Sequence, residues 1–288
     1  MLKIISWHWN GWRANEYSIE SFNILDRMLK ANLSIDYDFA VVTDDPKNPK
    51  YSMRTIPFPH DKKLKVNTRQ GRPNCLCRLK MFDRNSIDLF GKEGDHIVSM
   101  DVDVIIMKNI DSLFLKREEF KSLKGFYVPY SGGMIMHELG KNSILYDNFE
   151  GEKSLKESLR EMNTETNTRY AGSDQAWISN VYKNSQYPRW SVEDGCYSVT
   201  WNRFLLNNRV PENCLIVQTP GSRKPMTGGL RSFNQAIYDE YRKYMVEDME
   251  FEEGFYKLRR KSIYGKEGDS ILLESTDLIK KLRKRQII

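Results

Sequence analysis

The chain has 288 residues, of which 40% are hydrophobic, 12% aromatic and 29% charged, and its formal net charge is +6. A globular chain of this length forms one large or two small domains with a core of their own. The sequence contains no apolar run of about 18 residues, so we predict no membrane span. The mild positive charge favours anionic partners such as phosphates, nucleic acid or an acidic membrane surface.

The four cysteines are too few and too scattered for a disulfide framework, and the spacing of Cys75 and Cys77 is not that of a zinc site. The N-terminus begins with a strand-like segment and lacks the layout of a signal peptide. We therefore expect reduced thiols and a cytoplasmic protein.

The first part of the chain predicts a parallel sheet. Residues 2–9 read as a strand, residues 16–31 as an amphipathic helix, and Phe39–Thr43 as a second buried strand. Loops that follow such strands are where α/β folds bind ligands. The tryptophans at 7, 9 and 12 therefore either line a ligand loop or cover the core.

A basic stretch follows, and then a predicted helix. The basic residues Lys62, Lys63, Lys65, Arg69 and Arg72 indicate either an acceptor-contacting loop or a solvated face. Residues 74–90 show an apolar helical stripe that contains Arg78 and Lys80.

Two aspartates end the strand that this helix precedes. Ile97, Val98 and Met100 predict a short buried strand, and Asp101 and Asp103 follow it one residue apart. In extended backbone such residues point to the same side, and unpaired buried carboxylates are costly. A divalent cation shared with a substrate's phosphates removes this cost. The alternative is that the aspartates cap a turn or pair with a lysine.

Three later segments carry polar or glycine-rich turns. Tyr130–Gly133 is a glycine turn that permits close approach of the backbone to a ligand. Ser173 or Asp174 can cap a helix that continues through Gln175 and beyond. The turn at 218–225 presents a lysine and backbone amides, which suits a diphosphate.

The character of the sequence changes near residue 231. Residues 232–247 and 250–264 read as charged helices, and the chain ends in a short basic amphipathic segment, residues 278–285. This end either docks on an anionic surface, lipid or nucleic acid, or is a solvated helix. We therefore predict a domain over 1–230 and a helical, basic extension over 231–288.

The order of these features resembles that of the GT-A glycosyltransferases. They are Asp101-Val102-Asp103, the turn at 130–133, Ser173-Asp174-Gln175 and Gly221-Ser222-Arg223-Lys224-Pro225. The similarity covers about residues 3–226. It is greatest to the glycogenin-like retaining branch and to short bacterial and phage enzymes that begin with a Trp-x-Trp strand. The resemblance implies an α/β fold with a Rossmann-like mixed sheet flanked by helices.

The resemblance also implies a metal site and a reaction centre. Asp101 and Asp103 would hold Mn²⁺ or Mg²⁺ against the donor diphosphate. Asp174 and Gln175 would bind sugar hydroxyls near the reacting carbon, so the catalytic candidates are Asp103, Asp174 and Gln175. Gln218 stands where the family usually has a histidine as third metal ligand, and it is a weaker, neutral oxygen ligand.

The remaining implied residues bind the donor. They are Trp7, Thr43, Asp44, Arg78, Ser131, Gly132, Gly221 and Lys224. The sequence departs from the family at two further places: Met226 stands where tryptophan is usual, and Ser131 where asparagine is common.

The expected activity is metal-dependent transfer of a hexosyl or pentosyl unit from a nucleotide sugar to an acceptor hydroxyl, with retention. Because the loop at 62–72 and the C-terminus are basic, the favoured acceptor is a hydroxylated, for example hydroxymethylated, pyrimidine in DNA, flipped out of the duplex. A phage-encoded enzyme of this kind would act in the host cytoplasm. One alternative is synthesis of a cell-surface saccharide, with peripheral membrane contact. Another is a non-catalytic nucleic-acid-binding module with a vestigial donor pocket.

Overall fold

The computed structural model describes residues 1–9, 17–66, 75–125, 128–160, 173–199, 202–207, 209–220, 234–245, 256–257 and 272–273. The chain divides into two compact units, Met1–Tyr244 and Met245–Ile288. The first unit therefore ends at Tyr244, whereas the sequence predicted a boundary at residue 230.

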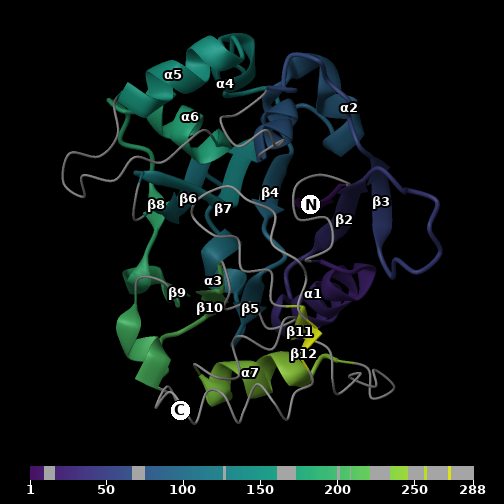
Figure 1. Cartoon of the computed structure of the whole chain (residues 1–288), viewed down its shortest axis with the longest axis vertical. Helices are drawn as coiled ribbons and strands as arrows, with labels where there is room; N and C mark the ends of the chain where they lie inside the picture. The colour runs from purple at the N-terminus through teal and green to yellow at the C-terminus, as the bar shows by residue number, and fades with distance from the viewer. Residues whose placement is uncertain are drawn as a thin grey trace. The chain divides into compact units, whose positions relative to one another are not determined.

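A mixed sheet of seven strands forms the centre of the first unit (Figure 1), in the order β3-β2-β1-β4-β7-β6-β8. The strands are β1 (Leu2–His8), β2 (Tyr37–Thr43), β3 (Arg54–Pro57), β4 (His96–Met100), β6 (Phe120–Lys124), β7 (Tyr130–Glu138) and β8 (Arg189–Trp190). The strands β3, β2, β1 and β4 run parallel, as the strand–helix–strand spacing predicted. The strand β7 pairs antiparallel with both β4 and β6, so the direction changes beside β4.

Helices flank this sheet, which confirms the predicted α/β class. They are α1 (Ile19–Asn32), α2 (Ile87–Phe90), α3 (Asp111–Phe114), α4 (Ile144–Asp147), α5 (Glu152–Arg160), α6 (Asp174–Val181) and α7 (Gln235–Arg242). The described residues also form short 3₁₀ helices: η2 (Cys75–Phe82), η3 (Arg84–Ser86), η4 (Val192–Asp194) and η5 (Arg203–Asn207).

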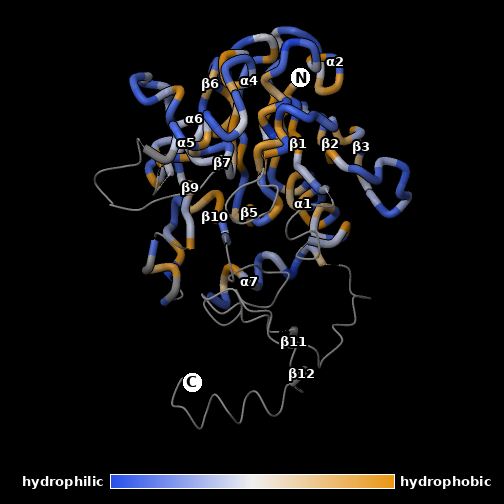
Figure 2. The backbone as a smooth tube through the Cα atoms, turned by 45° about the horizontal axis from the view of Figure 1, so that its top comes forward, coloured by the Kyte–Doolittle hydropathy of each residue, from blue (hydrophilic) through white to orange (hydrophobic). Residues whose placement is uncertain are grey.

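One hydrophobic cluster joins the parallel strands to η2 and α6, and so fixes the segments in which ligand-binding residues were predicted. Ile5, Val42 and Ile97 from three parallel strands pack in one cluster with Leu79 of η2 and Trp177 of α6. Figure 2 shows hydrophobic stretches along the strands and hydrophilic stretches in the loops between them. The helix η2 is thereby fixed over the sheet beside the end of β4.

The helix predicted over 74–90 is replaced by η2, η3 and α2. Asp83 explains the interruption, because its side chain accepts a hydrogen bond from Asn85 N (3.0 Å) and caps η3. Such local side-chain bonds compete with a continuous α-helix. The polar residues Arg78 and Lys80 also turn from the expected stripe toward carboxylates.

A second sheet of three strands continues from the two aspartates. Its order is β5 (Val104–Ile106), β10 (Ile216–Gln218) and β9 (Cys196–Ser198). Gln218 is in register with Val104, so β10 brings Gln218 next to the end of the Asp101–Asp103 turn.

The unit Met245–Ile288 contains a strand pair among its described residues, β11 (Tyr256–Lys257) with β12 (Leu272–Leu273). The helix predicted over 250–264 is thus wrong at Tyr256–Lys257, where cross-strand pairing replaces it. Part of the helix predicted over 232–247 is present as α7, but it belongs to the first unit. The basic segment at 278–285 lies outside the described residues. Within the described part of the chain, no helix is long and apolar enough to cross a membrane.

Candidate active site

Asp101 and Asp103 occupy the turn between β4 and β5, and their backbone is fixed on both sides. Asp101 N donates to Gly133 O of β7 (2.9 Å). The carbonyl of Asp103 accepts from both Thr219 N (2.9 Å) and Thr219 Oγ1 (2.8 Å). The turn is therefore held between β7 and the end of β10, independently of the two carboxylates.

Arg78 joins three elements at this turn. Its buried side chain extends from η2 and pairs with Asp101, and its Nε lies 2.8 Å from Asp174 Oδ2 of α6. Its Nη1 also donates to Gly132 O of β7 (3.1 Å). Burial lowers the pKa of Arg78, but Asp101 and Asp174 together hold that pKa well above its usual value, so the guanidinium stays charged.

Negative charge exceeds positive charge in this cluster. Burial, with Asp103 and Asp174, raises the pKa of Asp101 to about 7 against the opposing effect of Arg78. Three carboxylates around one guanidinium repel one another, which is the condition that a divalent cation relieves.

Asp174 is buried with incomplete hydrogen bonding. Its side chain is 1% exposed, and neither carboxylate oxygen has a well-aligned hydrogen bond within the described part of the chain, although Oδ2 is ion-paired with Arg78. Buried polar groups nearly always have partners, so this exception points to a group that the protein alone does not supply. The Oε1 atom of the neighbouring Gln175 accepts a hydrogen bond from Gly132 N (3.3 Å). Asp174 and Gln175 of α6 therefore lie beside the glycines of β7.

The paired glycines are required by close side-chain approach. A Cβ at Gly132 would lie 2.8 Å from Arg78 Nη2 and 3.1 Å from Asp174 Oδ2. A Cβ at Gly133 would overlap the amide of Gln218. Ser131 is buried and its Oγ accepts from Gly133 N (3.3 Å). The turn predicted at 130–133 is wrong: these residues are extended backbone at the start of β7, where Tyr130 and Ser131 pair with β6, and the two glycines lie against the aspartate cluster.

Tyr17 is a site residue that the sequence did not indicate. Its hydroxyl donates to Asp103 Oδ2 (3.1 Å), although 86 positions separate the two residues. The only local signal is its position directly before α1. Each predicted metal-binding aspartate therefore has a protein partner: Arg78 for Asp101 and Tyr17 for Asp103.

The residues predicted to surround the nucleotide lie at the ends of β1 and β2. Trp7 is buried, donates through Nε1 to Ser99 Oγ (3.1 Å) and packs against the ring of Phe58, so it covers the core. Thr43 is buried, with its hydroxyl 3.1 Å from Tyr51 Oη. Asp44 is exposed beyond it.

Four sequence predictions fall outside the described residues. They concern Gly221, Lys224, Met226 and the basic residues at 67–72.

The aspartates do not form a complete metal site alone. Among the described residues, no group of three or more His, Cys, Asp or Glu side chains could hold a metal ion. Gln218 is 8% exposed and faces Gly133, next to the turn. Two carboxylates with the remaining ligands from substrate phosphates is the usual arrangement for Mg²⁺, and the same oxygen ligands suit Mn²⁺. The residues present fit that arrangement.

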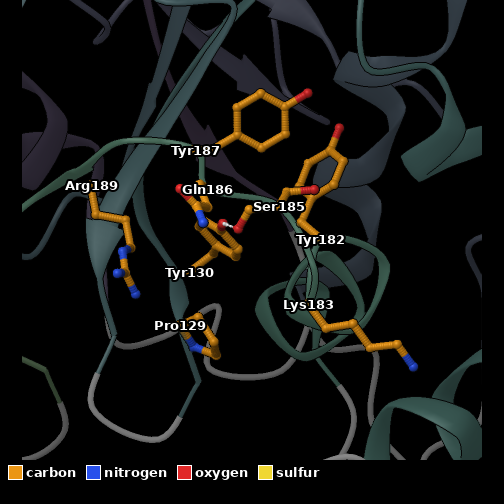
Figure 3. A pocket seen from close by; sticks show the side chains of 8 residues that line it. All are labelled: Pro129, Tyr130, Tyr182, Lys183, Ser185, Gln186, Tyr187 and Arg189. Carbon is orange, nitrogen blue, oxygen red and sulfur yellow. Dashed lines mark hydrogen bonds between the residues drawn. The ribbon is translucent and has the colours of Figure 1, made fainter.

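A separate pocket of about 380 Å³ lies beside α6 and β8 (Figure 3). It is lined by Pro129, Tyr130, Tyr182, Lys183, Ser185, Gln186, Tyr187 and Arg189. Tyr130 Oη donates to Ser185 O (2.8 Å), and the Arg189 guanidinium lies 5.9 Å from the centre of the Tyr130 ring. The lining contains no carboxylate and none of the predicted site residues.

The sequence matches no family model and no curated protein. Two solved structures of the glycosyltransferase GlyE from Streptococcus pneumoniae TIGR4 are similar, with TM-scores of 0.51 and 0.52 and identities of 12% and 11%. These matches cover 85% and 84% of this chain but only 60% and 59% of the GlyE chains. The galactosyltransferase LgtC, solved with donor and acceptor sugar analogues, matches at a TM-score of 0.49 and 11% identity, over 84% of this chain and 100% of its own. The chain therefore has the GT-A glycosyltransferase fold.

Proposed function

We propose that the protein is a metal-dependent glycosyltransferase that moves a hexosyl or pentosyl unit from a nucleotide sugar to an acceptor hydroxyl. The observation that carries this proposal is the cluster of Asp101, Asp103, Asp174 and Arg78 beside the end of β4 in a GT-A fold. Ligands of open α/β sheets bind at the carboxyl ends of the strands, where the strand order reverses.

Asp101 and Asp103 would hold Mn²⁺ or Mg²⁺, with Gln218 available as a neutral oxygen ligand. The bound ion would supply positive charge to the departing diphosphate. Tyr17 orients the carboxylate of Asp103, and Arg78 orients that of Asp101. Outer partners of this kind fix the direction of metal ligands.

Asp174 and Gln175 position the donor sugar. Asp174 is tied to Arg78 at 2.8 Å, which weakens it as a nucleophile and leaves its other oxygen to accept from a sugar hydroxyl. No other carboxylate among the described residues is a clear nucleophile candidate. A reaction on one face of the sugar, with retention, fits this arrangement.

The proposed acceptor is a hydroxylated pyrimidine in DNA, modified in the cytoplasm. Its support is the net charge of +6 and the basic segments of the sequence. Lys63, in the first of these segments, donates to Tyr146 O (2.6 Å) and is thus engaged with the protein itself. The acceptor assignment accordingly depends on Lys62, Lys65, residues 67–72 and the C-terminal segment.

Transfer assays decide the acceptor. A duplex with hydroxymethylated pyrimidines should accept labelled sugar, and its binding should weaken steeply with salt. An unmodified duplex of the same sequence is the control. Transfer to a lipid-linked or free saccharide, with none to the modified duplex, would instead identify an enzyme of cell-surface saccharide synthesis.

A thermal-shift screen of nucleotide sugars, with and without Mn²⁺, tests the donor site. Binding to the folded state stabilises the protein and raises Tm. At a ligand concentration of 100 times Kd the stabilisation is about 2.7 kcal/mol. We expect a shift with one nucleotide sugar that depends on Mn²⁺. A shift with double-stranded DNA but with no nucleotide sugar would indicate a non-catalytic binding module.

A further inference from the structure

Ser173 occupies the N-cap position of α6 without capping it. Its backbone is extended, with φ −136° and ψ 170°, as at other N-caps, yet its side chain makes no cap hydrogen bond. By contrast, Ser191 accepts from Glu193 N at the start of η4, and Asn234 accepts from Ile237 N at the start of α7. The local geometry of Ser173 suits a cap, but its hydroxyl is not used as one.

The Ser173 hydroxyl is also buried without a partner. The side chain is 6% exposed, and Oγ has no hydrogen bond within the described part of the chain. The next residue, Asp174, has no well-aligned hydrogen bond at either carboxylate oxygen, and of the two only Oδ2 is ion-paired, with Arg78. Ser173 Oγ and Asp174 Oδ1 are thus two buried polar atoms without a partner in the described part of the chain, and each such atom costs stability unless a ligand completes it.

The chemistry of these atoms selects the ligand. A hydroxyl both donates and accepts, whereas a carboxylate only accepts. A phosphate or carboxylate ligand would be repelled by Asp174, but a sugar hydroxyl can donate to Asp174 and bond to Ser173. The Cα atoms of consecutive residues lie about 3.8 Å apart, so groups on one small ligand can reach both side chains.

We propose that Ser173 is a specificity-determining residue that, together with Asp174, binds two neighbouring hydroxyls of the donor sugar. This inference rests on the proposed function, and it narrows the donor to sugars with an adjacent pair of hydroxyls. A monodeoxy donor would leave buried groups unpaired, which is how sites reject analogues that lack a hydroxyl. Ser173 therefore contributes to the choice of donor and not to the stability of α6.

The experiment compares Ser173→Ala with two other variants of the full-length chain. Ser173→Thr keeps the hydroxyl, and Ser191→Ala removes a serine that does cap a helix. For each variant we would measure Tm without ligand, and the Kd for UDP-glucose, UDP-galactose, GDP-mannose and the corresponding nucleoside diphosphates by calorimetry with Mn²⁺. The tightest nucleotide sugar would then be compared with its monodeoxy analogues.

Ser173→Ala should not lower the ligand-free Tm, because no cap bond is lost, and should raise it slightly, because a buried hydroxyl without a partner is removed. It should weaken the nucleotide sugar by about 5- to 10-fold, the effect of one hydrogen bond, without weakening the nucleoside diphosphate. In Ser173→Ala, the preference for the nucleotide sugar over one of its monodeoxy analogues should also decrease. Ser173→Thr should restore part of that preference. Ser191→Ala should lower Tm and leave both affinities unchanged.

Two results would overturn the inference while leaving the proposed function intact. One is a lower Tm for Ser173→Ala, which would make Ser173 an ordinary cap. The other is an equal loss of affinity for nucleotide sugar and nucleoside diphosphate. If the unaltered protein binds a nucleoside diphosphate but no nucleotide sugar, or binds neither, the proposed function fails and this inference fails with it.

Discussion

If the proposed metal site is correct, Asp101 should make metal binding dependent on pH. Burial raises its pKa to about 7, assisted by Asp103 and Asp174, so a proton competes with the ion for this ligand. We expect Mn²⁺ affinity, measured by calorimetry at pH 6, 7 and 8, to decrease below pH of about 7, with release of protons as the ion binds.

Asp101→Asn is the control for this titration, because it should bind Mn²⁺ weakly and with little change over the same pH range. A Mn²⁺ affinity of the unaltered protein that is constant from pH 6 to 8 would contradict the prediction.

The same raised pKa of Asp101 determines how the stability of the folded protein changes with pH. Ionisation of Asp101 disfavours the folded state, so the metal-free protein should lose stability as pH rises from about 4 toward 7.

Tyr17 should influence the metal through Asp103. Its hydroxyl donates to Asp103 Oδ2 (3.1 Å), and loss of such an outer partner typically lowers metal affinity by about 10- to 100-fold. Tyr17→Phe should show this loss in direct Mn²⁺ binding without donor. The matched control is Tyr51→Phe, whose hydroxyl contacts His8 and Thr43 and not an aspartate of the cluster. Equal affinities for the two variants would remove Tyr17 from the site.

Gly133 should be intolerant of a side chain because of Gln218. The methyl group of Gly133→Ala would overlap the Gln218 amide, and overpacking of this kind typically costs about 1–3 kcal/mol. Chemical denaturation would measure the loss. The double variant Gly133→Ala/Gln218→Ala should recover most of it, since the clash is removed. If the double variant is no more stable than Gly133→Ala, the overlap is not the cause.

At the scale of elements, Lys80 joins η2 to the segment that follows β3. Its ammonium lies 2.8 Å from Asp61 and 2.7 Å from Asp83, and it also donates to Tyr146 Oη of α4 (3.2 Å). Burial lowers the pKa of Lys80, but these partners raise it above its usual range, so the ion pairs persist at neutral pH. These contacts of Lys80 hold η2, the helix that carries Arg78, in place.

Lys80→Met should therefore cost about 2–3 kcal/mol in the free energy of unfolding, because two largely buried carboxylates lose their cation. Urea denaturation would measure this loss. Lys153→Met is the control: Lys153 pairs with Glu150 at 2.6 Å, but both side chains are more than half exposed, so little change is expected. Similar effects of the two substitutions would show that the Lys80 network does not brace η2.

Local pattern predicted the strands better than the segment before β4. Residues 2–9, 39–43 and 97–100 are apolar and short, and β1, β2 and β4 coincide with them. The periodicity of 74–90 predicted a continuous helix, whereas Asp83 and the ion pairs of Arg78 and Lys80 produce 3₁₀ turns. Asp83 acts locally, but Asp61, Asp101 and Asp174 are distant in sequence, so tertiary contacts add to the local interruption.

For the whole molecule, the order of motifs predicted both the fold and the assembly of the cluster. The resemblance implied that Asp101, Gly132 and Asp174 share one site, and Arg78 contacts all three. The contact of Tyr17 with Asp103 and the absent cap of Ser173 depend on side-chain geometry that no spacing encodes. The packing of Trp7 is a further feature that the sequence pattern did not determine: its side chain, a predicted donor contact, is buried against Phe58 and Ser99.

In the proposed function, the aspartate cluster binds a nucleotide sugar through a divalent cation and activates it. Hydrolysis or transfer of the nucleotide sugar found by thermal shift, with and without Mn²⁺, tests it most directly in the unaltered protein and in Asp103→Ala. The backbone bonds of Thr219 to Asp103 O survive this substitution, so the fold should be kept. Asp88→Ala, at an exposed carboxylate, is the control. We predict Mn²⁺-dependent turnover that falls by about 100-fold or more in Asp103→Ala alone; turnover that is unaffected by Asp103→Ala or by removal of the metal would contradict the account.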